Sequence, residues 1–258
     1  MNIGLLMFPD AEELDFVGPY EVFTMSNEVF ELEGKPEPDR VILISEDGNP
    51  VRCRKGMTIA AHESIATAPK LDVLLIPGGQ GTRTEVNNET LMAWVAEVDK
   101  STTWTTSVCT GALLLTGSGV AKGKRVTTHW AFVDQLAARG EAADVLRNIR
   151  YVRDGKIVTA AGVSAGIDMA LWLVGQWHGE QHARNTQRAM EYDPAPPYTA
   201  AVSQYRQSDF SEQAWKACIW SAASLTMLYS SNWRTLAMRS RQIFSIACHT
   251  LRTRPPET

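Results

Sequence analysis

Short apolar or β-branched runs alternate with longer helix-compatible segments along most of this chain. The runs predict strands at residues 2–8, 41–45, 71–76 and 102–108. Helices are predicted over residues 17–27, 89–98, 130–139 and 165–177, of which 89–98 has the clearest helical period. Strands that alternate with helices imply a mostly parallel sheet covered on both faces, so we expect an α/β fold.

Two hairpins are predicted beside these elements. Residues 50–61 contain a turn signal at Lys55 and Gly56, and Asp154 and Gly155 separate the strand-like segments 149–152 and 157–161. The acidic segment Asp10–Glu13, between the first run and the first helix, is expected to be a loop.

The most informative side chain is that of Cys109, at the corner between the predicted strand 102–108 and the helix-compatible segment 110–115. Ser107 and Gly111, two residues before and after it, are small, as a sharp strand-to-helix turn requires. This pattern predicts a nucleophile elbow with the sulfur at the edge of the sheet. A helix N-terminus also favours thiolate over thiol, although a lone cysteine is more often simply a core residue.

Ligands of open α/β sheets bind at the carboxyl ends of the strands, and three predicted strands are followed there by residues that could take part in catalysis or binding. Asp15 follows the first strand, Gly78 and Gly79 follow the strand at 71–76, and Cys109 and Thr110 follow the next. The backbone amides of Gly79 and Thr110 are candidates to stabilise negative charge near the sulfur. Asp15 is a candidate proton shuttle, and its alternative role is that of a solvated carboxylate at a helix start.

Composition narrows the function. The chain has 258 residues and a net charge of −4, which argues against general binding to nucleic acids or anionic membranes. No apolar run is long enough to span a bilayer, and the N-terminus is typical of a strand and not of a signal peptide. The four cysteines form no CxxC pair or zinc-ligand set, and they fit a cytoplasmic location.

The composition changes near residue 200, after the proline-rich segment 191–198. Residues 201–258 hold seven Lys or Arg against three Asp or Glu, together with three tryptophans. We therefore expect one domain over residues 1–200 and a basic C-terminal extension of unknown role over 201–258.

Six motifs occur in an order that resembles the ThiJ/PfpI superfamily, which has the class I glutamine amidotransferase-like fold. They are ELDFVGP, LLIPGGQG, SVCTGALLL, TTHW, AAGVSAGID and EYDPAPP, and the resemblance covers roughly residues 1–200. The resemblance implies a flavodoxin-like sandwich and a homodimer that uses no metal or cofactor.

The same resemblance implies roles for individual residues. Cys109 would be the nucleophile, Asp15 its acid/base partner, and Thr110 a hydroxyl that holds Asp15 or the substrate. Protease-like members have histidine directly after the cysteine, and Thr110 stands there in this chain. That difference favours the branch that resembles isonitrile hydratases, which would convert a small isonitrile to an N-substituted formamide. Gly78, Gly79 and His129 are then the expected oxyanion and substrate contacts.

Other hypotheses remain open at this point. The sequence GVSAG matches a serine elbow at Ser164, although no acid and histidine follow it in a suitable order. His178 and His182 lie four residues apart without a zinc motif. Cys109 could also serve as a redox sensor, as the thiolate of a different enzyme, or within a ligand-sensing regulator related to AraC-linked domains.

Overall fold

A seven-stranded sheet forms the centre of the computed structural model, which describes residues 1–198. The strand order is β10-β11-β7-β6-β1-β2-β5, and every neighbouring pair is parallel except β10 with β11. The strands are β1 (Asn2–Leu6), β2 (Arg40–Ser45), β5 (Glu63–Ser64), β6 (Val73–Ile76), β7 (Trp104–Val108), β10 (Tyr151–Asp154) and β11 (Ile157–Ala160). The predicted α/β fold with a mostly parallel sheet is confirmed. The predicted extension at 201–258 lies outside the described residues.

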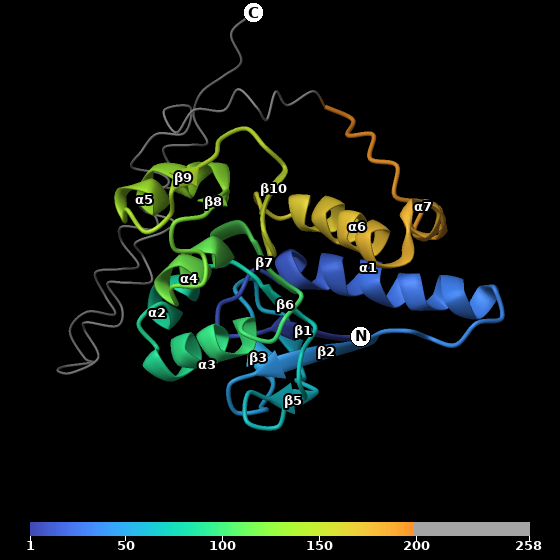
Figure 1. Cartoon of the computed structure of the whole chain (residues 1–258), viewed down its shortest axis with the longest axis horizontal. Coiled ribbons are helices and arrows are strands. Elements are labelled where there is room, and N and C mark those ends of the chain that lie inside the picture. Colours follow the sequence, from blue (N-terminus) through green and yellow to red (C-terminus); the bar gives the residue numbers. More distant parts are fainter. Residues whose placement is uncertain (199–258) are drawn as a thin grey trace, which may run out of the picture. The chain divides into compact units, whose positions relative to one another are not determined.

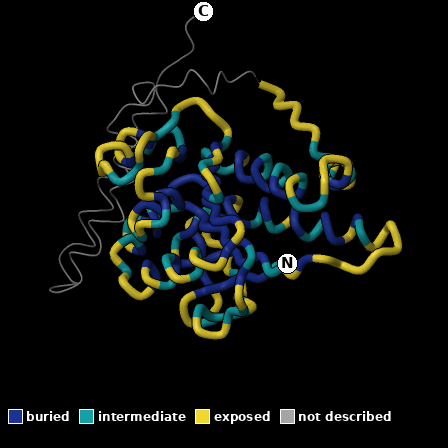
Figure 2. Tube along the Cα trace, in the orientation of Figure 1, coloured by how far each residue is buried: buried dark blue, intermediate teal, exposed yellow. Residues whose placement is uncertain are grey.

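Helices cover both faces of this sheet (Figure 1). On one face α1 (Glu13–Leu32) packs against α6 (Ala165–His178) and α7 (Glu180–Ala189). On the other, α4 (Ala112–Gly117) packs against α2 (Thr82–Glu85) and α3 (Glu89–Asp99). The central strands are buried along their length, as Figure 2 shows, because both faces are covered and their side chains are apolar.

Smaller elements extend from the sheet. The predicted hairpin at 50–61 is present as β3 (Val51–Arg52) and β4 (Thr58–Ile59). A second small sheet pairs β8 (Arg125–Val126) with β9 (Asp144–Val145), next to η2 (Trp130–Phe132) and α5 (Val133–Ala138).

The largest departure from the sequence prediction concerns the first helix. The structure starts α1 at Glu13 and continues it to Leu32, whereas the sequence predicted a helix over 17–27. Gly18 and Pro19 lie inside this helix and do not interrupt it. As a result Asp15 lies in the first turn of a helix, and its side chain is completely buried and not solvated.

The strand order explains where a site can form. β1 pairs with β2 on one side and with β6 on the other, so the chain turns in opposite directions after β1 and after β6. Such a switch point leaves a crevice at the carboxyl ends of the strands. Asp15 follows β1, Gly78 and Gly79 follow β6, and Cys109 follows β7, so this end of the sheet brings three predicted groups together.

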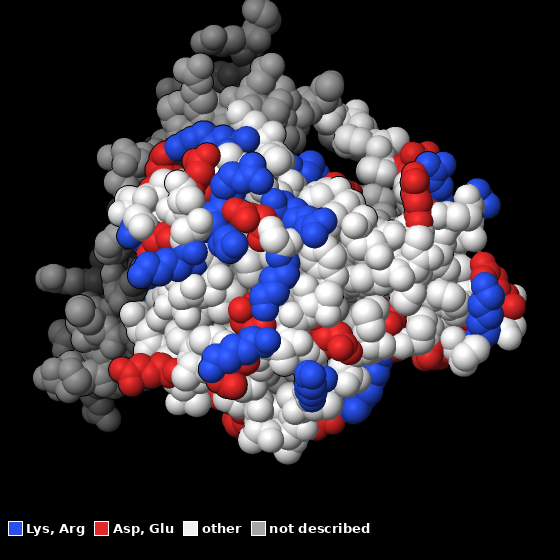
Figure 3. Space-filling view, viewed as in Figure 1, with Lys and Arg blue, Asp and Glu red and all other residues white. Residues whose placement is uncertain are grey.

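Surface charge is mixed in the described part of the chain. Figure 3 shows lysine and arginine side chains gathered around β8 and β10, with acidic side chains between them. Lys124 and Arg125 both pair with Asp154, and Arg150 pairs with Asp168. Among the described residues, no helix is long and apolar enough to cross a bilayer.

Candidate active site

Cys109 lies at a sharp corner between β7 and the turn η1 (Cys109–Gly111), which leads into α4. Its φ is +56°, a left-handed value that residues with side chains rarely adopt and that marks a strained elbow. A Cβ on Gly111 would lie 2.7 Å from the carbonyl oxygen of Pro77, so only glycine fits there. The predicted sharp strand-to-helix turn at Cys109 is confirmed, and the predicted small residue after the sulfur has a steric cause; the nucleophilic role of Cys109 stays a prediction.

Asp15 is the acidic partner beside this elbow. Its Oδ2 accepts a 2.8 Å hydrogen bond from the Gly78 backbone amide, while Oδ1 has no regular hydrogen-bond partner among the described residues. Burial raises the pKa of Asp15 from 3.8 to about 7, the charge of Glu12 adds to the rise, and the Gly78 amide and the Cys109 thiol oppose it. The carboxyl group is therefore poised to exchange a proton at neutral pH.

The Cys109 thiol is only 7% exposed. Burial is the main cause that raises its pKa well above 9.0, and the charge of Asp15 adds to it. The Thr110 backbone amide and the Arg83 guanidinium lower the pKa, but by less. The prediction of a resting thiolate from the helix N-terminus is therefore wrong, because desolvation outweighs the amide. Cys109 and Asp15 together hold a proton that must move before the sulfur can attack.

Thr110 connects the elbow to the loop after β6. Its hydroxyl accepts a 3.0 Å hydrogen bond from the Gly79 amide and lies 3.2 Å from the Gly79 carbonyl oxygen. No hydrogen bond joins Thr110 to Asp15 within the part of the chain that the structure describes. Of the two roles expected for Thr110, contact with the substrate is the one that its position beside a cavity favours.

Gly78 and Gly79 make contacts that glycine alone permits. A Cβ on Gly78 would lie 2.5 Å from the Thr110 nitrogen and 2.8 Å from the Cys109 Cβ, and Gly79 has a φ of +116°. Their amides donate to Asp15 and to Thr110, respectively. The expected oxyanion contact of these glycines stays a prediction, and the bonds that are present orient the two side chains beside the sulfur.

His129 lies close to this group of residues. Its Nδ1 accepts the Ala131 amide at 3.3 Å, and its ring packs so closely on Gly162 that a Cβ there would lie 3.1 Å from Nε2. Burial, followed by the charge of Arg83, lowers the pKa of His129 to about 4. The imidazole is thus neutral at pH 7, and its contact with a substrate stays a prediction.

Arg83 is the functional candidate that the sequence analysis missed. Its Nη1 donates to the Gly79 carbonyl oxygen at 2.6 Å and to the Thr110 hydroxyl at 3.3 Å, and its guanidinium stacks 4.2 Å from the centre of the Phe132 ring. Nothing in the motif GGQGTR predicted this position, because Phe132 comes from a distant segment of the chain.

The structure does not support the alternative of a serine nucleophile at Ser164. Ser164 is exposed and its hydroxyl contacts the Arg150 guanidinium, while Asp168 pairs with Arg150 and Tyr192, so neither side chain is held as in a serine hydrolase. The GVSAG segment instead lets His129 pack on Gly162.

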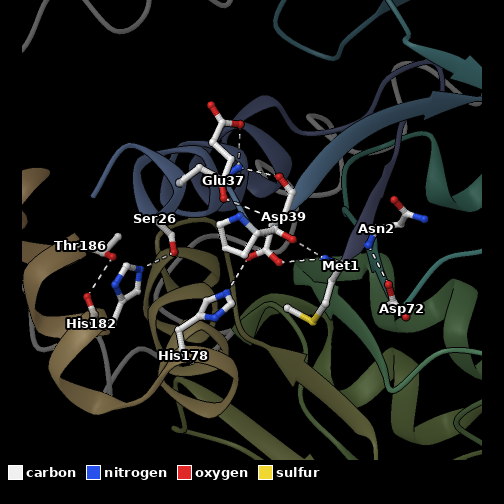
Figure 4. A network of polar contacts seen from close by, with 11 residues as sticks. Met1, Asn2, Ser26, Glu37, Asp39, Asp72, His178, His182 and Thr186 are labelled. Carbon is white, nitrogen blue, oxygen red and sulfur yellow. Dashed lines mark hydrogen bonds and ion pairs between the residues drawn. The ribbon is translucent and has the colours of Figure 1, made fainter. Parts of the chain in front are cut away.

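His178 and His182 take part in packing between helices (Figure 4). His178 Nε2 lies 2.6 Å from Asp39, and His182 Nε2 lies 2.9 Å from the Ser26 hydroxyl. The described residues contain no group of three or more His, Cys, Asp or Glu that would hold a metal ion. These two histidines therefore tie α6 and α7 to α1 and to the start of β2.

Comparison with known proteins places the chain in a family. A model of the DJ-1/PfpI family matches residues 1–176. The chain belongs to the DJ-1/PfpI family. Isonitrile hydratase of Pseudomonas putida is 35% identical over 198 residues, which is 77% of this chain and 81% of that protein. The crystal structure of a ThiJ/PfpI family protein from Pseudomonas syringae has a TM-score of 0.71 and 29% identity, and the match covers 88% of this chain and 87% of that one.

The family also includes regulators. The HTH-type transcriptional regulator CdhR of Pseudomonas aeruginosa is 27% identical over 182 residues, or 70% of this chain. The match covers 52% of the regulator, so the chain spans about half the length of that relative. Family membership alone therefore does not separate catalysis from regulation, and the chemistry of the site has to decide.

Proposed function

We propose that this protein hydrates an isonitrile to an N-substituted formamide through a covalent thioimidate on Cys109. The observation that carries the proposal is the strained Cys109 elbow beside a buried carboxyl group whose pKa is near neutrality. The 35% identity to an isonitrile hydratase supports the choice of substrate.

The reaction begins with the proton that Cys109 and Asp15 share. As the sulfur attacks the terminal carbon of R–N≡C, the thiol proton passes to Asp15, and Asp15 delivers it to that carbon. The product of this step is a thioimidate, R–N=CH–S–Cys. Covalent capture of this kind divides one difficult hydration into two easier steps.

Water completes the reaction. Asp15, now a carboxylate, takes a proton from water as the oxygen adds to the thioimidate carbon, and passes this proton to the nitrogen. The tetrahedral intermediate then expels the sulfur, the hydroxyl proton passes through Asp15 to the sulfur, and R–NH–CHO is released. Because the pKa of Asp15 is about 7, one group can serve as acid and then as base near neutral pH.

The neighbouring residues support these steps in different ways. The Gly78 amide fixes the Asp15 carboxyl, and the Thr110 amide and Arg83 stabilise the thiolate that forms during attack. The Thr110 hydroxyl lines the cavity in which the substrate would lie. Hydrogen bonds directed at charge that develops in the transition state are worth about 10²–10³ in rate each.

A direct assay tests the proposal. The full chain is mixed with cyclohexyl isocyanide, and formamide is followed by NMR, with mass spectrometry of the trapped Cys109 adduct. We expect turnover in the unmodified protein and none in Cys109→Ala, while Cys53→Ala, which removes the other buried thiol of the described residues, keeps turnover. Substantial hydration by Cys109→Ala would refute the covalent route.

A ligand-sensing regulator is the second candidate, and the similarity to CdhR is what favours it. A regulator would bind a small molecule in the same cavity without turning it over. A redox sensor stays a prediction, because the raised pKa of Cys109 slows oxidation of the thiol in the same way as it slows attack on a substrate until Asp15 takes the proton. The homodimer and the cytoplasmic location stay predictions.

A further inference from the structure

A small cavity lies directly beside the Cys109 elbow. Its volume is about 250 Å³, and it is lined by Arg83, Thr110, Leu113, Thr128, Phe132, Gln135, Leu136 and Arg139. Thr110 follows the reactive cysteine in sequence, and the Thr128 hydroxyl donates to the Cys109 carbonyl oxygen at 2.8 Å. Cys109 itself does not line the cavity, but the charge of Arg83, which does, acts on the Cys109 thiol, so a molecule held at Arg83 lies near the sulfur. The volume is a little below the ~300–1,000 Å³ of most ligand pockets, which suits a compact substrate.

Arg83 gives this cavity an unbalanced positive charge. Among the described residues, no carboxylate lies within ion-pair distance of its guanidinium, and the oxygens that it contacts belong to neutral groups. The three hydrogen bonds to those oxygens all come from Nη1. A guanidinium has five N–H donors, so the donors on Nε and Nη2 make none of these bonds. Arg139, the other arginine of the cavity, is neutralised by Glu141 at 2.5 Å.

A partly buried guanidinium without a carboxylate partner destabilises the folded protein, because its charge is partly removed from water. Burial lowers the pKa of Arg83 from its ordinary value, and besides its hydrogen bonds to neutral oxygens the guanidinium has the Phe132 ring as a weak cation–π partner. Charged side chains are rarely buried unless a partner or ligand balances them. A carboxylate satisfies a planar guanidinium best, because it accepts two parallel N–H bonds.

We propose that the cavity binds a substrate through a carboxylate on its R group, with Arg83 as the cationic contact. Phe132, Leu113 and Leu136 then pack against the short carbon chain between the carboxylate and the reacting carbon. The inference rests on the proposed function for the identity of the reacting group, and on the cavity alone for the carboxylate. It assigns the substrate to the class of small ω-isocyano carboxylates.

The first test compares two substrates that differ in charge. The kcat/KM of the full chain is measured with 3-isocyanopropanoate and with its methyl ester. We expect a preference of at least about tenfold for the carboxylate. Because Arg83 also stabilises the Cys109 thiolate, Arg83→Gln should slow both substrates, but it should lower the carboxylate-to-ester ratio of kcat/KM by about tenfold or more. Arg83→Lys, which keeps the charge, should retain part of the preference.

A matched control comes from the same cavity. Arg139→Gln removes a charge that Glu141 already balances, so the ratio between the two substrates should change by less than about threefold. Equal kcat/KM for ester and carboxylate in the unmodified protein overturns the inference, as does an equal loss for both substrates in Arg83→Gln.

A second test does not need hydratase activity. Cys109 is alkylated with iodoacetate or with iodoacetamide, and peptide mass spectrometry gives the ratio of the two rates. Arg83→Gln should lower the iodoacetate-to-iodoacetamide ratio by about tenfold, and any general effect on thiol reactivity cancels in the ratio. The buried Cys53 reports whether the variant is still folded.

The two tests fail separately. If no isonitrile is hydrated but the alkylation ratio depends on Arg83, the proposed function is wrong and the carboxylate site stands. If both isonitriles are hydrated equally and the alkylation ratio does not depend on Arg83, the function stands and the carboxylate site is wrong.

Discussion

Asp15→Asn replaces a buried carboxyl group by an amide. The stability of this variant, relative to that of the unmodified protein, should increase as the pH rises. In the unfolded chain this carboxyl loses its proton near pH 3.8, whereas in the folded protein burial delays the loss to about pH 7. Between these values the folded state binds more protons than the unfolded state, so the stability of the unmodified protein falls as the pH rises. Asp15→Asn cannot titrate and escapes this loss.

The magnitude follows from the two pKa values. The interval from 3.8 to about 7, at about 1.36 kcal/mol for each pKa unit, corresponds to about 4 kcal/mol. The asparagine oxygen can still accept the Gly78 amide, so that hydrogen bond is retained. The new NH₂ group changes the free energy of unfolding by the same amount at each pH. The change of that free energy with pH therefore reports only the ionisation of Asp15.

Urea unfolding at pH 4.5, 6.0, 7.5 and 8.5 measures this trend. The free energy of unfolding of Asp15→Asn, relative to the unmodified protein, should rise through about pH 7 and then level off. Asp154→Asn is the control that should stay flat over these pH values, because the Arg125 amide lowers the pKa of the partly exposed Asp154 carboxyl and the group is ionised in both the folded and the unfolded chain. A relative stability of Asp15→Asn that stays flat from pH 4.5 to 7.5 would show that burial does not hold a proton on Asp15.

Two further substitutions test the geometry around the site. Gly111→Ala should destabilise the protein by about 1–3 kcal/mol or more and abolish turnover, because the new Cβ would lie 2.7 Å from the Pro77 carbonyl oxygen. Gly175→Ala in α6 is the control. It should be tolerated, because no atom lies closer than 3.6 Å to the new Cβ. Thermal unfolding and the formamide assay check both variants. His178→Leu should cost about 1–3 kcal/mol in urea unfolding by removing its 2.6 Å bond to Asp39, with hydratase activity at low urea unchanged.

The sequence alone determined the fold class and the position of the sharp turn at Cys109, the proposed nucleophile. Buried parallel strands are continuous apolar runs, and their order along the chain, with helices between them, specifies a sheet whose carboxyl ends carry Asp15, Gly78 and Cys109. The requirement for a small residue at Gly111 could also be predicted, because it depends on the local geometry of a sharp turn.

The tertiary structure decided the charge state and the recognition chemistry of the site. The sequence placed Cys109 at a helix N-terminus and predicted a thiolate, but desolvation by residues from several elements outweighs that local effect. It left open whether Asp15 is solvated, and the packing of α1 buries the side chain completely. No sequence pattern indicated Arg83, because its role depends on contacts with the Phe132 ring and the Gly79 carbonyl oxygen. Only the folded chain places these groups beside the guanidinium. Local patterns specify elements, whereas pKa values and binding contacts depend on neighbours that are distant in sequence.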